Sequence, residues 1–417
     1  MPSLPVRLKE LTSRAENALG RKAPLGPDLD LSSFSPAAAA PVGKASLSPR
    51  GAIGKASLRA GVDLGSQDRA GTYLQVDRSV LCSRAAGAFR EEVEILPVGD
   101  ALSRHRWLRD LWWRLVEVDT DKYTASTALD PPEGYFIRIL PGRKTAAPVQ
   151  SCLLLSTESS VQRVHNVIVA EEGSEAHVIT GCTTHPRAKS GLHIGVSEFY
   201  VRRGASLTFT MIHNWAEGFH VRPRSAALVE EGGTFVANYV IMNPVRSIQM
   251  YPTTILAGKR ARSRFQAILS GRGESLLDVG SRTILEGKGS CSESVSRAIA
   301  SGRSTILARG SLVARADDCR GHLECRGMLS SPGATIRAVP ELEADGVPRA
   351  ELSHEAAISP IAEEEVAYLM SRGLPREEAL STIIRGFLNV DLLGLPSSLQ
   401  RTVDSILAGT PLETSGF

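Results

Sequence analysis

The chain has 417 residues, of which 48 are Lys or Arg and 45 are Asp or Glu. A formal net charge of +3, spread along so long a chain, argues against a dedicated nucleic-acid-binding protein. Its 42% of hydrophobic residues is enough for a globular fold of two or three structural units. The 37 glycines and only 5% of aromatic residues indicate many turns and an aliphatic core.

The lengths of the hydrophobic runs and the spacing of the cysteines indicate in which cellular compartment the protein is expected. No apolar run reaches the length of about 18 residues that a membrane span needs, and residues 1–7 lack the apolar core of a signal peptide. The six cysteines form no C-x-x-C pair, so neither a disulfide framework nor a zinc knuckle is indicated. They are Cys82, Cys152, Cys182, Cys291, Cys319 and Cys325. We therefore expect reduced thiols and a cytoplasmic protein.

Residues 1–70 are rich in Ala, Pro, Gly and Ser, which predicts a flexible leader. They contain a short duplication, at 43–47 and 54–58, in which Lys44 and Lys55 are each followed by Ala. A phosphate-binding P-loop requires Ser or Thr after this lysine. We therefore expect this chain to bind no nucleotide.

Residues 71–133 predict a mixed, partly helical region. Between about 99 and 117, apolar residues at helical spacing form a stripe that includes Trp107 and Trp112. Tryptophans on such a stripe are typical of packing anchors rather than of a ligand site.

Residues 134–350 predict a solenoid of short strands. The strands alternate in polarity, as where Leu207, Phe209 and Met211 share one face. Glycine-centred turns separate them at intervals of 31, 28, 26, 29 and 23 residues, a drifting period within the range of solenoid repeats. The turn glycines are Gly173, Gly204, Gly232, Gly258, Gly287 and Gly310. Because the tandem aliphatic hexapeptide of left-handed solenoids is missing, we predict a mainly β protein with a right-handed parallel β-helix core, flanked by helical N- and C-terminal regions.

Residues 351–417 predict a helical region. One helix ends near Gly373, and a second begins at Pro375 and carries an apolar stripe over 379–388. A third short helix is expected at about 396–407. The stripe either closes the last coil of the solenoid or docks a partner protein.

A histidine and a carboxylate are adjacent between the β region and these helices, at His354 and Glu355. One interpretation is a helix start with Ser353 as N-cap. The other is a binding site, in which an imidazole and an anionic oxygen lie beside a bound group.

Eight motifs occur in an order that resembles the SufB/SufD family of iron–sulfur cluster assembly proteins, over about residues 60–390. They are Asp119-Thr120-Asp121-Lys122-Tyr123-Thr124, Gly134-Tyr135-Phe136-Ile137-Arg138, His165-Asn166 with Gly181-Cys182-Thr183, Val221-Arg222-Pro223-Arg224, Gly321-His322-Leu323-Glu324-Cys325, Ser353-His354-Glu355-Ala356 and Tyr368-Leu369-Met370-Ser371-Arg372-Gly373-Leu374.

The resemblance implies a role as a scaffold that assembles and transfers clusters in the SUF system. It implies an ABC-type ATPase partner, SufC, docked on the C-terminal helices. Any ATP hydrolysis then comes from that partner, and we expect this chain not to be an enzyme. It also implies a transiently held iron–sulfur cluster of the 4Fe-4S type, a sulfur donor and apoprotein clients.

The same resemblance assigns candidate site residues. Cys182 matches the SufB cysteine that is thought to accept sulfur, a role that needs an accessible thiol with thiolate character. Cys325 matches a cysteine of SufB-like sequences, and strand alternation places it on the same face as Leu323, where a buried core thiol is the alternative. Cys325, His354 and Glu355 are the candidate metal and cluster ligands, because imidazole and carboxylate make a more labile site than thiolates alone.

The sequence also departs from the family. The position of the second SufB cysteine is occupied by Ala334, so that cysteine is absent. Glu355, by contrast, follows His354 as it does in SufB. One hypothesis is a homodimer in which each subunit contributes His354 and Glu355 to a shared interface, in place of a SufB/SufD heterodimer. A structural, SufD-like protein without a cluster is the alternative. A carbohydrate-active β-helix enzyme would need clustered carboxylates, for which Asp317-Asp318 is one acidic doublet of the β region.

Overall fold

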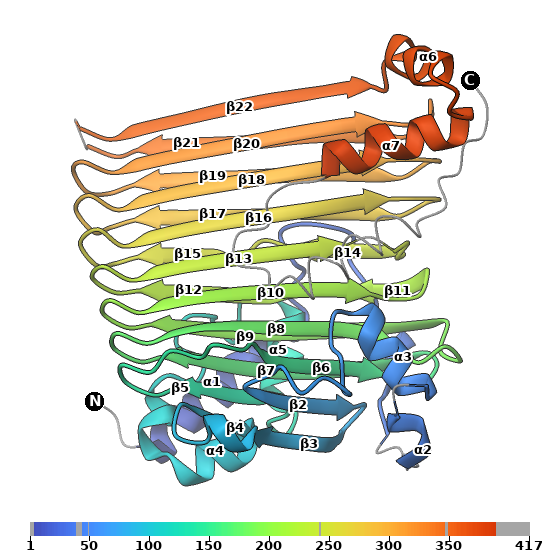
Figure 1. The fold of residues 1–417 in the computed structure, drawn as a ribbon. Helices are drawn as coiled ribbons and strands as arrows, with labels where there is room; N and C mark the ends of the chain where they lie inside the picture. Colours follow the sequence, from blue (N-terminus) through green and yellow to red (C-terminus); the bar gives the residue numbers. More distant parts are fainter. Residues whose placement is uncertain (1–3, 39–43, 49, 242, 347–348, 389–417) are drawn as a thin grey trace.

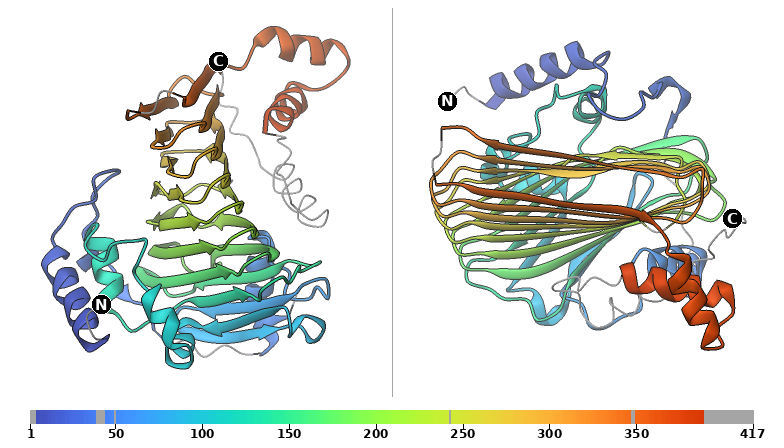
Figure 2. Two further views of the ribbon diagram at one scale, coloured as in Figure 1. Left: turned by 90° about the vertical axis from the view of Figure 1, so that its left-hand side faces the viewer. Right: turned by 90° about the horizontal axis from the view of Figure 1, so that it is seen from above.

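The computed structural model describes residues 4–38, 44–48, 50–241, 243–346 and 349–388. Over these residues the chain forms a β-solenoid of about eight coils with short helices at both ends (Figure 1). The predicted mainly β solenoid with helical flanks is therefore confirmed. In the left view of Figure 2 the N-terminal helices lie toward one end of the stack, and the two C-terminal helices lie beside the other.

Each coil contributes strands to two facing sheets. The ten-stranded sheet consists of β2 (Gly71–Val76), β3 (Ser79–Ala85), β6 (Val149–Leu155), β8 (Glu175–Thr184), β10 (Ser206–Asn214), β13 (Thr234–Ile241), β16 (Arg262–Gly271), β18 (Cys291–Ala300), β20 (Arg320–Leu329) and β22 (Glu351–Pro360). The twelve-stranded sheet consists of β1 (Ser35–Pro36), β4 (Val93–Pro97), β5 (Tyr135–Ile139), β7 (Ser160–Ala170), β9 (Ser190–Val201), β11 (Gly218–Val221), β12 (Arg224–Val229), β14 (Ser247–Met250), β15 (Thr253–Leu256), β17 (Leu276–Leu285), β19 (Thr305–Ala314) and β21 (Thr335–Ala344).

Pairing between successive coils is parallel, and among the described strands the antiparallel pairs are β2–β3 and β4–β5. The inward-facing side chains of both sheets form the main core, as expected of coils that bury their faces against one another. Leu207, Phe209 and Met211 of β10 all point into it, as their alternation predicted.

Glycines allow the tight turns of several coils. Gly173 and Gly204 both have φ of +65°, a conformation that costs other residues energy. Their N–H groups donate to Arg203 O (3.0 Å) and Glu231 O (2.9 Å), so each turn stacks on the next. The turn predicted at Gly310 is wrong: this residue lies within β19, where a Cβ atom would come within 2.9 Å of Leu323.

The flexible leader predicted for residues 1–70 is also wrong over the residues that the structure describes. They form α1 (Leu4–Ala18), η1 (Leu31–Ser33), α2 (Lys44–Leu47) and α3 (Ala52–Arg59). Ala15 and Ala18 of α1 are buried in a cluster with Trp112, and Ile53 and Ala56 of α3 pack on the strands of the first coils. Small side chains at helical spacing let these helices lie close to the solenoid. The composition rich in Ala, Pro, Gly and Ser gave no indication of this packing.

The helix predicted over 99–117 is shorter than expected. The region contains η2 (Gly87–Phe89), α4 (Val98–Arg104), η3 (Arg106–Asp110) and α5 (Lys122–Leu129). The chain leaves the helical path because the buried Glu198 carboxylate accepts hydrogen bonds from four successive backbone N–H groups, those of residues 113–116. Trp112 stacks on His165 with ring centroids 3.7 Å apart, so its expected role as a packing anchor is confirmed.

The C-terminal boundary needs one correction. Residues 351–360, predicted to open a helical region, form β22, the last strand of the ten-stranded sheet. The helices that follow are α6 (Glu363–Ser371) and α7 (Arg376–Leu388). The third helix predicted at 396–407 lies outside the described residues. Among the helices described, none combines the length and the apolar character needed to cross a membrane.

Candidate functional site

Within the described residues, the last coil of the solenoid is open. There β22 pairs with β20 alone and β21 with β19 alone, so each strand has a described neighbour on one side. None of the residues of β21 and β22 is fully buried, and the large apolar side chains of Leu342 and Ile358 are 44% and 39% exposed. An edge that is long, exposed and partly apolar is a surface on which another strand can pair.

His354 points into the interior of this open coil. It lies opposite Leu323, which faces the core, and its backbone is extended, so the interpretation of this segment as a helix start is wrong. Its Nε2 atom is buried and has no hydrogen-bond partner among the described residues. A buried polar atom without a partner calls for an explanation, and an absent ligand is one.

Cys325 lies on the same inner face, in the coil below. It pairs with Ala356, which places it diagonally next to His354 across two neighbouring strands. It is 6% exposed, and burial raises the pKa of its thiol, while a hydrogen bond with Ser296 acts in the opposite direction. The alternation predicted for this strand is confirmed: Cys325 and Leu323 are both buried, and Leu323 lies against Gly310 of the facing sheet.

Glu355 points the other way. On the outer face its carboxylate forms an ion pair with Arg326, at 3.2 Å, and Arg326 also reaches Glu324 at 2.7 Å. Because His354 and Glu355 are consecutive residues of one strand, they lie on opposite faces of the sheet. The described residues of one chain accordingly contain no group of three or more His, Cys, Asp or Glu side chains arranged to hold a metal ion. The structure brings Cys325 and His354 together and leaves Glu355 apart.

Cys182 occupies a different part of the interior. It is fully buried in β8, and its Sγ lies 3.8 Å from His193 Nε2 and 3.4 Å from Met211 Sδ. Burial raises the pKa of this thiol well above its usual value and lowers the pKa of His193 to about 3, so both groups are neutral at pH 7. The accessible, thiolate-like character that a sulfur acceptor needs is therefore absent in this structure.

Sequence reasoning missed the polar partners of Cys182. His193 adjoins the thiol, and its Nδ1 lies 3.0 Å from Gln162 Oε1. The signal was strand alternation, because His193 stands between Leu192 and Ile194, which face the opposite side. Five strand spacings separate β8 from β20, or roughly 24 Å, so Cys182 and Cys325 belong to separate sites.

The two C-terminal helices differ in how their apolar residues are used: those of α7 are mostly buried, and some of those of α6 are exposed. The stripe predicted as a docking surface is mostly buried within the chain, at Ala379, Leu380, Ile384 and Leu388. The C-terminal part of α7 packs on a row of isoleucine and valine side chains on the outer face of the ten-stranded sheet, and its first turns pack on α6. The exposed apolar side chains are instead on α6, where Tyr368 is 58% exposed and Met370 is 44% exposed.

Comparison with known proteins gives consistent matches. A family profile described as "SUF system FeS cluster assembly, SufBD core domain" matches residues 153–387. An iron–sulfur cluster assembly SufBD family protein of Methanothermobacter thermautotrophicus (strain Delta H) is 47% identical over 413 residues, which cover 96% of this chain and 100% of the relative. One of Archaeoglobus fulgidus is 45% identical and covers 82% of this chain and 91% of its own length. The iron–sulfur cluster assembly protein SufB of Bacillus subtilis is 29% identical and covers 69% of this chain and 62% of its own.

Proposed function

This chain belongs to the SufBD family of iron–sulfur cluster assembly proteins, and from that premise we propose that it is a scaffold subunit on which clusters are built and passed on. The observation that carries the proposal is the open last coil, where a histidine with a free, buried Nε2 lies diagonally next to an inward-facing cysteine. Imidazole and thiolate are both good iron ligands, and a site with few of them holds a cluster transiently.

The open coil also supports a homodimer. Two copies related by a twofold axis can pair their β22 strands edge to edge, since each edge has unused backbone donors and acceptors. Pairing would cover Ile358 and Leu342, and would bring two His354 side chains and two Cys325 thiols toward one seam. Iron binding requires each thiol to lose its proton, and iron itself favours that loss.

Glu355 enters the proposal as a ligand from the outer face. It can reach iron only after its ion pair with Arg326 breaks, and that pair costs little to break because both side chains are about half exposed. The sulfur-acceptor role of Cys182 stays a prediction from resemblance, on the condition that sulfur reaches it through the interior of the solenoid.

The proposed partner is an ABC-type ATPase of the SufC kind, in the cytoplasm, with α6 as the docking helix. Tyr368 and Met370 give α6 an exposed apolar surface, and three acidic residues begin the helix. Large apolar side chains left in solvent on a helix are typical of partner binding. A Tyr368→Ala, Met370→Ala double variant should weaken co-purification with the ATPase, whereas Ala367→Ser on the same helix should not.

A structural role without a cluster is the second candidate. It is favoured by Ala334, which stands where a SufB-type cysteine is expected, and by the protonated state that burial gives the Cys325 thiol. Anaerobic reconstitution with ferrous iron and sulfide separates the two candidates. A scaffold gains the visible absorbance of sulfide-to-iron charge transfer and retains iron and sulfide through gel filtration. A purely structural subunit gains neither.

A further inference from the structure

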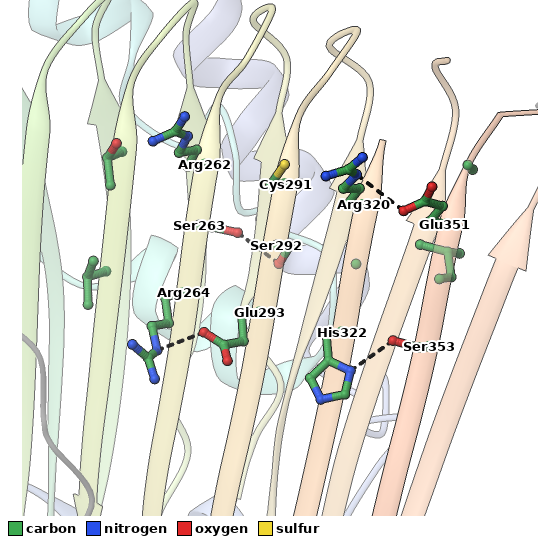
Figure 3. A pocket seen from close by; sticks show the side chains of 15 residues that line it. Arg262, Ser263, Arg264, Cys291, Ser292, Glu293, Arg320, His322, Glu351 and Ser353 are labelled. Carbon is green, nitrogen blue, oxygen red and sulfur yellow. Dashed lines mark hydrogen bonds and ion pairs between the residues drawn. The ribbon is translucent and has the colours of Figure 1, made fainter. Parts of the chain in front are cut away.

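A groove of about 870 Å³ crosses the outer face of the ten-stranded sheet, over β13, β16, β18, β20 and β22 (Figure 3). It lies on the face opposite His354 and Cys325, so it is separate from the proposed cluster site. Strand pairing arranges its polar side chains in two rows. The first row, across the strands, is Arg262, Cys291, Arg320 and Glu351, and the second is Arg264, Glu293, His322 and Ser353.

The first row places a thiol between two guanidinium groups. Arg262 and Arg320 are the register partners of Cys291 on either side, one strand spacing of about 4.8 Å away. Arg320 pairs with Glu351 at 3.2 Å, whereas the Arg262 guanidinium has no ion-pair partner within the part of the chain that the structure describes. One cationic group thus lies free beside Cys291 in a groove wide enough for a ligand.

The side chains of the second row pair with one another, so the groups that remain available to a ligand are in the first row. Arg264 pairs with Glu293 at 3.1 Å, and His322 Nδ1 lies 2.8 Å from Ser353 Oγ (Figure 3). With three arginines against two glutamates, the groove carries a net positive charge. It therefore favours an anionic ligand whose reactive atom meets the thiol.

Accessibility separates Cys291 from the other thiols. Cys152, Cys182, Cys319 and Cys325 are buried, and only Cys82 and Cys291 are partly exposed. Cys82 lies opposite the apolar Leu74 on β2, with no cation as its cross-strand partner. The thiolate is the nucleophilic form of cysteine, and reactive cysteines sit in electropositive, partly exposed surroundings, which describes Cys291.

We propose that this groove is the entry point for sulfur and that Cys291 accepts the terminal sulfur of an anionic persulfide. In the step, the Cys291 thiolate attacks the outer sulfur of R–S–SH, and the donor S–S bond breaks. The donor leaves as the thiolate R–S⁻, and Cys291–S–SH forms with the proton still on the transferred sulfur. No external oxidant or reductant is consumed. Arg262 and Arg320 attract the anionic donor and stabilise the thiolate that leaves. The inference rests on the proposed function: the sulfur on Cys291 becomes sulfide for the cluster when a dithiol reductant supplies two electrons, which breaks the S–S bond at Cys291 and leaves the reductant as a disulfide.

The test treats the full chain with glutathione persulfide under anaerobic conditions, blocks the thiols and maps the added sulfur by peptide mass spectrometry. The wild-type protein is expected to carry the added sulfur mainly on Cys291, so the site of sulfur transfer is identified without any variant. Cys291→Ser should lose it, and Cys82→Ser, the matched control, should keep it. Replacing both Arg262 and Arg320 by Gln should slow the transfer by roughly tenfold, and added salt should slow the wild-type reaction in the same direction. The proposal is overturned if Cys291 gains no more sulfur than Cys82, or if Cys182 is labelled as fast in Cys291→Ser as in the wild type.

Reconstitution with free sulfide distinguishes a failure of the sulfur entry point from a failure of the scaffold function. Cys291→Ser should assemble a cluster normally from ferrous iron and free sulfide, and should differ from the wild type only in the sulfur that it accepts from glutathione persulfide. If the wild-type protein forms no cluster even from free sulfide, the scaffold function fails. If the wild-type protein forms a cluster from free sulfide but Cys291 accepts no sulfur, only the proposed entry point is wrong.

Discussion

The two ends of the solenoid differ in how completely their strands are covered. In the first coils every residue of β2 and β6 is buried, and helices and loops from the N-terminal region pack against them. In the last coil no residue of β21 or β22 is fully buried. Both ends consist of the same kind of strands, yet among the described residues only the first end is covered. At the last coil the two sheets extend beyond the part of the core that is covered, which leaves a surface for binding.

The largest effect expected at the open end is on cluster assembly. His354→Ala should abolish the visible absorbance gained on anaerobic reconstitution, because it removes the inward-facing imidazole. The fold should be retained, since β22 is at the edge and largely exposed. Ser353→Ala, the neighbouring outward-facing position, is the control and should reconstitute normally. A His354→Ala protein with full absorbance would remove this residue from the site.

The closed end should respond in stability instead. Leu153 is fully buried in β6, and Leu153→Ala should lower the free energy of unfolding by about 2–5 kcal/mol through lost burial and a cavity. Leu342→Ala at the open end should change it by less than about 0.5 kcal/mol in the monomer. Denaturant midpoints measure both variants. Equal losses would mean that the open end is as well packed as the closed one.

Acid should destabilise the inner coils. Burial lowers the pKa of His193 and of His213 to about 3, whereas both titrate near 6.5 in the unfolded chain. Stability is therefore fully present above pH 6.5 and falls as the pH drops from 6.5 toward 3. At pH 5 the loss is about 2 kcal/mol for each histidine, measured as the pH dependence of the unfolding free energy. His193→Gln should flatten that dependence, and an unchanged slope would contradict the neutral, buried state of His193.

The smallest effect is expected at the outer-face ion pairs of the open end. Arg326→Gln should change stability by at most about 1 kcal/mol, because the Arg326 and Glu355 side chains are 45% and 57% exposed. It should also release Glu355 for iron. A measurable rise in the rate of iron uptake, compared with Arg320→Gln as a control on the same strand, would support Glu355 as a ligand from the outer face; a rate equal to that of the control would not.

Much of the fold was predictable because it depends on local patterns. Alternation placed Leu207, Phe209 and Met211 on one face, and glycine spacing located the turns at Gly173 and Gly204. The leader was missed because its alanines pack only once the solenoid exists to receive them. Gly310 was misplaced because a glycine facing a large side chain and a glycine in a turn look alike in sequence.

The candidate site was predicted only in part. Alternation was applied to Cys325 and gave its true face, but residues 351–360 were assigned to the helical region and so were not treated as a strand. Had that segment been recognised as a strand, His354 and Glu355 would have been separated at once. The burial of Cys182 and the groove around Cys291 depend on how distant coils stack, and no local pattern carries that information.

We propose that two copies of the chain join at the open coil and build one cluster between them. Native mass spectrometry of the anaerobically reconstituted protein measures both quantities together, the number of chains and the metal and sulfide they hold. We expect a dimer that carries one cluster for two chains, and an apo monomer for Ile358→Lys at the edge. A cluster held by monomers, or a dimer that remains free of iron, would contradict it.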